Sequence, residues 1–277
     1  MRSDLRVVMV LLLVSLLVGC AAMSRKFTFM RPDLTHREFT RTAPEYTFKA
    51  DRRTTSSAHE RLMLAGQRLQ AGQLDEAEKQ ARAALKAQPD SVDANTILAA
   101  VADQRGQAGQ AGGYFAKAAE LAPNRGEVLN NYGVWLCGNG RALESLSWFD
   151  RALSDPAYAG AANARVNAGA CAADAGQLQR AERDLRMALA QQPENSLALA
   201  AMARAKYAMG QYLEARAFSE RRLAAAPATA EVLRLASQIE HKLGDNQAAA
   251  RYEQQVAVQF PPGTAQRGAT GNSTDIQ

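Results

Sequence analysis

Small and apolar residues recur at helical spacing through most of the chain, and residues 162–195 show the pattern most clearly. The first half of this stretch has one such face, made by Val166, Gly169, Ala172 and Ala173. The second half has another, made by Leu178, Ala181, Leu185, Ala188 and Leu189. Both sets are spaced three and four residues apart, as one face of a helix requires. Gly176 and Gln177 separate the halves and Pro193 follows the second, so the stretch predicts a helical hairpin.

The same hairpin pattern repeats with a period of about 34 residues. Glycines recur at the predicted turns: Gly72, Gly106, Gly140, Gly176, Gly210 and Gly244. Prolines recur after the second helices at Pro89, Pro123, Pro193, Pro227 and Pro261, while Pro156 falls one position early in a slightly long third repeat. One hairpin cannot bury its own apolar stripe, so neighbouring copies must cover it. The period therefore predicts a stack of hairpins.

Small residues recur where paired helices must approach each other closely. One series is Ala65, Ala99, Gly133, Gly169, Ala203 and Ser237, and a second is Ala77, Ala111, Ser145, Ala181, Ala215 and Ala249. A third, Ala84, Ala118, Ala152 and Ala188, departs to Arg222 and Val256, so the last two repeats fit least well. The pattern resembles the tetratricopeptide repeat (TPR) family. This resemblance implies an all-α TPR α-solenoid over residues 58–263, with about six helix–turn–helix repeats in a right-handed superhelix.

The composition suits thin helical hairpins and argues against nucleic-acid binding. Hydrophobic residues make up 47% of the chain, much of it alanine, and aromatic residues only 6%. The net charge is +5, but the arginines are scattered over predicted helix surfaces. The sequence shows no basic stripe or aromatic platform on which a nucleic acid could bind.

The first twenty residues predict a secretory signal. Arg2 and Arg6 precede an apolar run, residues 7–18, that is shorter than the ~20 residues needed to span a membrane. The sequence Leu17-Val18-Gly19-Cys20 resembles the bacterial lipobox, which implies removal of residues 1–19 and lipidation of Cys20. The residue after Cys20 is Ala21 and not aspartate. By resemblance to the sorting rules of such lipoproteins, this implies an anchor in the outer membrane, facing the periplasm. An uncleaved anchor with an incidental cysteine is the competing interpretation.

Two segments outside the repeats lack helical periodicity. Residues 20–57 contain prolines and many hydroxyl residues, which predicts a lipidated N-terminus followed by a tether. Its aromatic residues exceed what a spacer needs, so part of it is a candidate to dock onto the first repeat or a partner: Phe27, Phe29, Phe39, Tyr46 and Phe48. Residues 264–277 are rich in Gly, Thr and Asn and predict a disordered tail.

Cys137 and Cys171 are the cysteines that remain when Cys20 is set aside. An even number of cysteines in an oxidising compartment favours a disulfide. Both fall late in the first helices of consecutive repeats, which pack side by side in this fold, so we expect a Cys137–Cys171 bond. Two separate buried thiols are the alternative, because free cysteine packs well as a small hydrophobe.

The sequence contains no constellation that would make the protein an enzyme. His36, His59 and His241 are scattered and none lies in a metal-binding motif, so we expect no metal and no cofactor. The turn at Gly138-Asn139-Gly140 is not followed by the Gly-Lys-Ser/Thr of a phosphate loop. A small-molecule substrate is therefore not expected.

Repeats three and four carry a more specific resemblance. Repeat three begins Leu129-Asn130-Asn131-Tyr132-Gly133-Val134-Trp135-Leu136-Cys137, and repeat four has Asn167-Ala168-Gly169-Ala170-Cys171. With the lipobox, tether and repeats, these strings resemble the type IV pilus biogenesis and stability lipoproteins, the PilF/PilW family of pilotins. That resemblance implies a monomer bound to the outer membrane that binds the pilus secretin, promotes its targeting and multimerisation, and so supports twitching motility. A TPR lipoprotein scaffold for another envelope machine, such as cell-wall synthesis or outer-membrane protein insertion, is the alternative.

Repeat phase places a set of candidate partner-binding residues along the groove: Asn130, Asn131, Val134, Asn163, Val166, Asn167, Ala170, Arg204 and Tyr207. Mid-helix asparagines are poor helix formers, so they need another role. They either bridge neighbouring helices or hold the backbone of an extended partner, and both roles are compatible. The lysines and arginines with which TPR co-chaperones grip a terminal carboxylate are absent, so the mostly small and apolar lining favours a hydrophobic peptide or helix.

Overall fold

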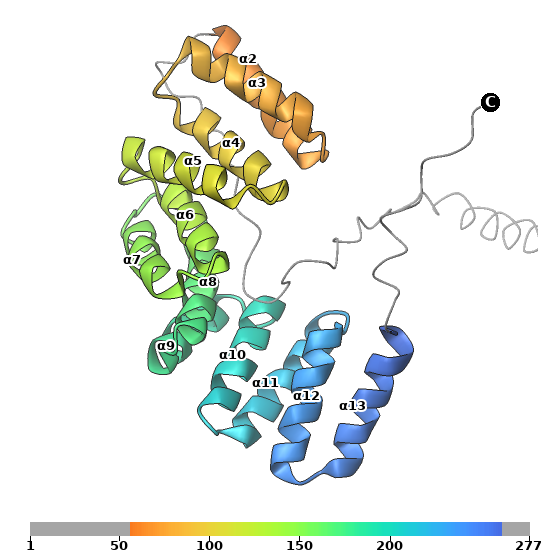
Figure 1. The fold of residues 1–277 in the computed structure, drawn as a ribbon. Helices are drawn as coiled ribbons and strands as arrows, with labels where there is room; N and C mark the ends of the chain where they lie inside the picture. The colour runs from red at the N-terminus through yellow and green to blue at the C-terminus, as the bar shows by residue number, and fades with distance from the viewer. Residues whose placement is uncertain (1–55, 262–277) are drawn as a thin grey trace, which may run out of the picture. The chain divides into compact units, whose positions relative to one another are not determined.

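The computed structural model describes residues 56–261, and this part of the chain consists of helices and short connections (Figure 1). The helices are α2 Ser56–Gln70, α3 Leu74–Ala87, α4 Val92–Gln104, α5 Ala108–Leu121, α6 Gly126–Gly138, α7 Ala142–Leu153, α8 Ala161–Asp174, α9 Leu178–Gln191, α10 Ser196–Ala208, α11 Tyr212–Ala225, α12 Ala230–Leu243 and α13 Asn246–Gln259. The predicted signal, Cys20, the tether up to residue 55 and the 264–277 tail lie outside the described residues.

Each pair of helices forms a hairpin whose turn depends on glycine. The predicted turn glycines, from Gly72 to Gly244, all have positive φ, between 71° and 83°. Side-chain-bearing residues rarely adopt this left-handed conformation, and glycine adopts it without strain. In repeat four, α8 and α9 end and begin on either side of Gly176, and α9 buries Ala181, Leu185, Ala188 and Leu189. The predicted hairpin and its predicted apolar face are therefore confirmed.

The hairpins stack in chain order, with the first helices forming one layer and the second helices the other. Successive first helices contact each other in the pairs α2–α4, α6–α8, α8–α10 and α10–α12. Each first helix from α4 onward also contacts the second helix of the preceding repeat. These contacts give the all-α TPR α-solenoid that the sequence predicts. Within the described residues, no helix is both long and apolar enough to cross a membrane.

The third repeat is longer than the others, and its extra residues cap the N-terminus of its first helix, α6. The connection from α7 to α8 spans residues 154–160, longer than the four-residue connection 192–195 after α9. Asp155 Oδ2 accepts a hydrogen bond from the Gly126 N–H at 2.9 Å, which satisfies a free donor at the start of α6. The ring of Tyr158 covers Gly126, where a Cβ would lie 2.5 Å from Tyr158 Cγ. The insertion therefore caps α6.

The departure to Arg222 in the fifth repeat has a structural explanation. The Arg222 side chain is buried, and Nη1 donates to the carbonyl oxygens of Ala226 at 3.0 Å and Pro227 at 3.2 Å. These carbonyls follow the end of α11, where a cation is favourable. Burial lowers the pKa of Arg222 from its usual value. Arginine thus replaces the usual alanine and closes the end of α11, and repeats five and six still form hairpins.

An aromatic cluster joins repeats two and three. The Tyr132 ring lies 6.0 Å from the Trp135 ring and 4.7 Å from the Trp148 ring, measured between centroids. Phe115 of α5 lies 6.3 Å from Trp135. Ring pairs at these distances add stability beyond the area they bury. The aromatic residues of the third repeat are therefore packing residues.

Gly112→Ala is expected to destabilise the protein by about 1–3 kcal/mol, because it overpacks this cluster. A Cβ at position 112 would lie 2.7 Å from Trp135 Cζ2, and Trp135 is itself held between Tyr132 and Phe115. Gly113→Ala is the matched control, since a Cβ there meets nothing within 4 Å. Alanine at that exposed helical site should stabilise by up to about 1 kcal/mol. Urea unfolding checks both, and equal midpoints for the two variants would contradict the packing account.

Candidate functional site

The candidate partner-binding residues come from three successive first helices. Asn130, Asn131 and Val134 lie on α6; Asn163, Val166, Asn167 and Ala170 lie on α8; Arg204 and Tyr207 lie on α10. We call the side of α4, α6, α8 and α10 that carries these repeat positions the groove face. The layer of first helices brings the residues to one side of the stack, as their repeat phase predicts.

Two of the groove asparagines bridge neighbouring repeats. Asn167 Nδ2 donates to Asn130 Oδ1 at 3.2 Å, which joins α8 to α6 through a buried hydrogen bond. The Asn130 Nδ2 atom is also buried, and no hydrogen-bond acceptor lies within reach of it. A buried amide donor without an acceptor is costly, so this group calls for a partner such as a water molecule or a ligand. The Asn130 side chain therefore links α6 to α8 through its Oδ1 atom, while its Nδ2 atom remains a hydrogen-bond donor without an acceptor.

Exposure divides the candidate residues into two groups. Six are at most 3% exposed: Asn130, Asn131, Val134, Val166, Asn167 and Ala170. Asn163, Arg204 and Tyr207 are half-buried. Arg204 Nη1 lies 3.6 Å from Asp174 Oδ1, and the Tyr207 ring packs 5.5 Å from that of Tyr212. The three half-buried residues lie on α8 and α10, and the six buried ones lie on α6 and α8.

A disulfide joins the two helices that carry the asparagine pair. Cys137 lies near the end of α6 and Cys171 lies in α8, with Cα atoms 5.9 Å apart and a sulfur–sulfur bond between them. This Cα separation falls in the usual range for disulfides. The bond and the Asn167–Asn130 hydrogen bond are two links between α6 and α8, so the register of repeats three and four is fixed where the candidate residues lie.

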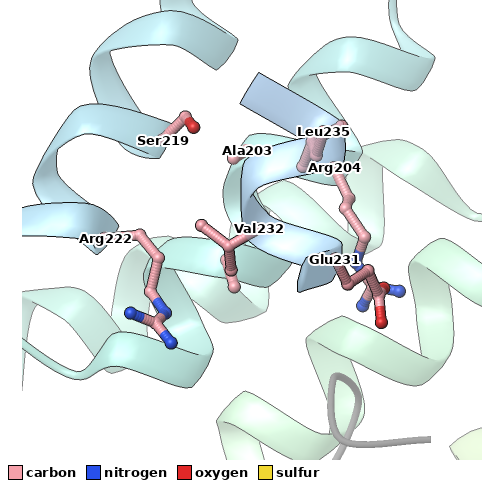
Figure 2. A pocket seen from close by; sticks show the side chains of 8 residues that line it. Ala203, Arg204, Ser219, Arg222, Glu231, Val232 and Leu235 are labelled. Carbon is pink, nitrogen blue, oxygen red and sulfur yellow. The ribbon is translucent and has the colours of Figure 1, made fainter. Parts of the chain in front are cut away.

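A narrow pocket opens farther along, between α10, α11 and α12 (Figure 2). Its lining is Ala200, Ala203, Arg204, Ser219, Arg222, Glu231, Val232 and Leu235. Figure 2 shows the Arg204 and Glu231 side chains converging on one side of Val232, with Arg222 on the other. The Ser219 hydroxyl is buried without a hydrogen-bond partner. Sequence reasoning did not predict this pocket. A sign of it in the sequence is Arg222, which stands where the earlier repeats have alanine.

A serine, a glutamate and a histidine meet in the last repeat, but their order does not suit nucleophilic catalysis. Ser237 Oγ donates to Glu253 Oε1 at 3.0 Å, and His241 Nε2 contacts the same oxygen at 3.0 Å. In a hydrolytic triad the histidine lies between the serine and the carboxylate so that it can take the serine proton. Here the carboxylate lies between them and raises the pKa of His241. The group ties α12 to α13.

Metal-binding groups are not assembled in the part of the chain that the structure describes. No three His, Cys, Asp or Glu side chains among residues 56–261 come together as ligands for an ion. The described site consists of amides, small apolar side chains and a few charged residues. Such a lining suits recognition of another polypeptide, which is the usual role of TPR repeats.

Comparisons with known proteins agree with this class. Family models described as tetratricopeptide repeat match residues 62–126 and 172–239. No curated protein sequence matches the chain. The protein is a TPR α-solenoid, and TPR repeats mediate protein–protein interaction.

The solved structures define the family. PilW, described as a widely conserved type IV pilus biogenesis factor, is 31% identical; the match covers 76% of this chain and 97% of PilW, with a TM-score of 0.71. The chain therefore belongs to the PilW family of type IV pilus biogenesis factors.

Two further solved structures support the fold. PilF from Pseudomonas aeruginosa is 23% identical over 76% of this chain and 94% of its own, with a TM-score of 0.66. A tetratricopeptide repeat protein from Parabacteroides merdae is 17% identical over 73% of this chain and 78% of its own, with a TM-score of 0.57. At these identities the likeness establishes the shared solenoid alone.

Proposed function

We propose that the protein is an outer-membrane lipoprotein that acts as a pilotin, promoting the outer-membrane targeting and multimerisation of the type IV pilus secretin. The observation that carries the proposal is the 31% identity to a type IV pilus biogenesis factor over nearly the whole of that chain. The paired motifs of repeats three and four, which the sequence resemblance singled out, form the linked centre of the groove face. The groove then binds the secretin and the lipid anchor holds the complex at the membrane.

The chemistry of the groove face suits an extended secretin segment. The Asn130 Nδ2 donor can meet a backbone carbonyl, while Val134, Val166 and Ala170 offer small apolar surface to its side chains. Arg204 of α10, which is half-buried and pairs with Asp174 at 3.6 Å, adds a charged group to the same layer of helices. Binding requires that this closed face open to the incoming segment, since its central residues are buried.

Replacing Asn130 and Asn167 together with leucine is expected to weaken secretin binding about tenfold or more, because two amide partners are worth roughly 1–3 kcal/mol. The double variant should lose less stability than either single variant, since both members of the buried hydrogen bond become apolar groups of similar size and neither is left without the other. Asn124→Leu, in an exposed connection, is the matched control. Co-purification with the secretin and thermal unfolding are the measurements. Unchanged secretin recovery with the double variant would place the binding site elsewhere.

The membrane anchor has its own test. Cys20→Ser is expected to leave the helical spectrum unchanged and to remove the protein from the outer-membrane fraction, because stable anchoring needs the acyl chains. Fractionation of cells expressing the variant checks this. If the variant remains in the outer membrane, the lipid anchor is not what holds the protein there.

The alternative function is a TPR lipoprotein scaffold for another envelope machine. Family membership and the asparagine–cysteine motifs of repeats three and four favour the pilus. Affinity purification from envelope extracts separates the two: recovery of cell-wall synthesis or outer-membrane insertion proteins in place of the secretin would favour the alternative.

A further inference from the structure

The fifth repeat lacks a large packing residue that repeats two to four have. The same position of their second helices holds Phe115, Phe149 and Leu185, each at most 2% exposed. A Cβ added to Gly133 would lie 2.9 Å from Phe149 Cε1, so Phe149 fills the space beneath its first helix. Repeat five has Ser219 at this position. A serine is too small to fill the same space, so a cavity is expected beneath α10.

That space is the pocket between α10, α11 and α12 (Figure 2). Ser219 lines it together with small or apolar residues: Ala200, Ala203, Val232 and Leu235. The free volume is about 10 Å³, which is roughly the room that one water-sized group needs. The pocket therefore admits the tip of a short side chain and excludes a large one.

Residues of the groove positions line the same pocket. Arg204 is one of the candidate partner-binding residues, and Leu235 of α12 holds the repeat position of Asn167. Figure 2 shows the Arg204 and Glu231 side chains converging beside Val232, so charged groups flank the apolar lining. A polypeptide segment that follows the groove face past α10 therefore meets this pocket.

The Ser219 hydroxyl gives the pocket a polar group that needs a partner. Ser219 is 3% exposed, and its Oγ atom has no hydrogen-bond partner among the described residues. Other buried serines are satisfied: Ser145 Oγ donates to the Ala142 carbonyl at 2.6 Å, and Ser237 Oγ donates to Glu253 at 3.0 Å. A buried hydroxyl without a partner is costly, so a group that enters the pocket with a hydroxyl of its own gains a hydrogen bond.

We propose that this pocket binds a threonine side chain of a partner polypeptide. The threonine methyl group contacts Val232 and Leu235, and its hydroxyl meets the Ser219 hydroxyl. Valine lacks the hydroxyl, serine lacks the methyl group, and leucine or phenylalanine exceeds the free volume. The inference rests on the proposed function for the groove as the place where a partner segment binds, and it adds the side chain that anchors the segment.

A phage-displayed random peptide library tests the preference without the secretin. The purified protein, with Cys20 replaced by serine, selects peptides, and a Ser219→Leu variant removes those that bind elsewhere. The remaining peptides are expected to share a threonine, and its replacement by valine should weaken binding about tenfold. Ser219→Ala should abolish this difference, because the comparison isolates the two hydroxyls. Failure to recover such peptides, or a threonine preference that persists in Ser219→Ala, would overturn the proposal.

The blocking variant has a matched control. Ser219→Leu should fold, since repeat two packs Phe115 and Ala99 in one buried cluster at the equivalent positions. It should bind the selected peptides at least about tenfold more weakly, because leucine occupies the pocket. Ala217→Leu makes a similar change at an exposed site of the same helix and should leave binding unchanged. Circular dichroism verifies the fold of both variants.

Thiol labelling tests whether the pocket opens to solvent. Ser219→Cys, in protein that also carries Cys20→Ser, is expected to react with methyl methanethiosulfonate, whose methylthio group is small. Ser145→Cys is the control, since Ser145 is fully buried and lines no such pocket, and it should stay unmodified. Equal protection of both thiols would contradict an open pocket. Labelling without threonine-selective peptides would mean that the pocket holds only water, which also overturns the proposal.

The secretin is scored separately, so the two proposals fail in different ways. Threonine-selective peptides together with a secretin that does not co-purify would support the pocket and contradict the pilotin function. Normal secretin recovery with Ser219→Leu would leave the pilotin function standing and contradict the pocket as its anchor.

Discussion

Phe149→Ala is expected to lower the free energy of unfolding by about 3–5 kcal/mol, the usual cost of removing a fully buried phenylalanine. Phe149 has no exposed surface and belongs to the apolar cluster shared by repeats three to five. Its ring lies against Gly133, where a Cβ would come within 2.9 Å of Phe149 Cε1. The small residue at position 133 and the large one at position 149 therefore fit as a pair, and alanine would leave a cavity.

Urea unfolding followed by far-UV circular dichroism measures this effect. Leu143→Ala in the same helix is the matched control, because Leu143 is 66% exposed and should change stability by at most about 0.5 kcal/mol. Since each repeat contacts only its neighbours, the loss should fall on the central repeats first. Similar midpoints for the two variants would show that the α6–α7 interface does not limit stability.

Removing the disulfide is the second large change. Cys137→Ser is expected to cost roughly 3–4 kcal/mol, because the bond closes a loop with a sequence separation of 34 residues and so restricts the unfolded chain. The variant also loses one of the links that hold α6 against α8 beside the asparagine pair. Secretin binding should weaken along with stability.

The disulfide prediction has a direct chemical control. Reducing agent should destabilise the wild type and leave the Cys137→Ser, Cys171→Ser double variant unchanged. A thiol assay on the denatured, unreduced protein should find neither Cys137 nor Cys171 reactive. Two reactive thiols from these positions, or wild-type stability that does not respond to reductant, would contradict the bond.

The regular part of the fold could be predicted from the sequence because each repeat carries the same local signals. Gly176 marks a turn that only glycine adopts easily, and Leu178, Ala181 and Leu185 mark one helix face. Because every repeat carries these signals, each hairpin has an apolar face that only a neighbouring hairpin can bury, and a stack results. The pairing of Cys137 with Cys171 was foreseeable for the same reason, since both occupy late positions in neighbouring first helices.

The remaining features depend on contacts between residues far apart in the chain. The carboxylate of Asp155 reaches back to the Gly126 N–H, a contact set by the path of an irregular connection. Arg222 was seen only as a departure from a small-residue series, whereas its role depends on where the Ala226 and Pro227 carbonyls point. Repeat phase assigns Asn130 to the groove but does not predict that it is buried, because burial depends on contacts between residues far apart in the chain.

The most direct test of the pilotin account is the state of the pilus secretin in cells that lack this protein. Outer-membrane and inner-membrane fractions are separated, and heat- and detergent-resistant secretin multimers are measured in each. The account predicts that the multimers disappear or remain in the inner membrane, and that the wild-type gene restores them. Normal multimers at the outer membrane of the deletion strain would contradict it.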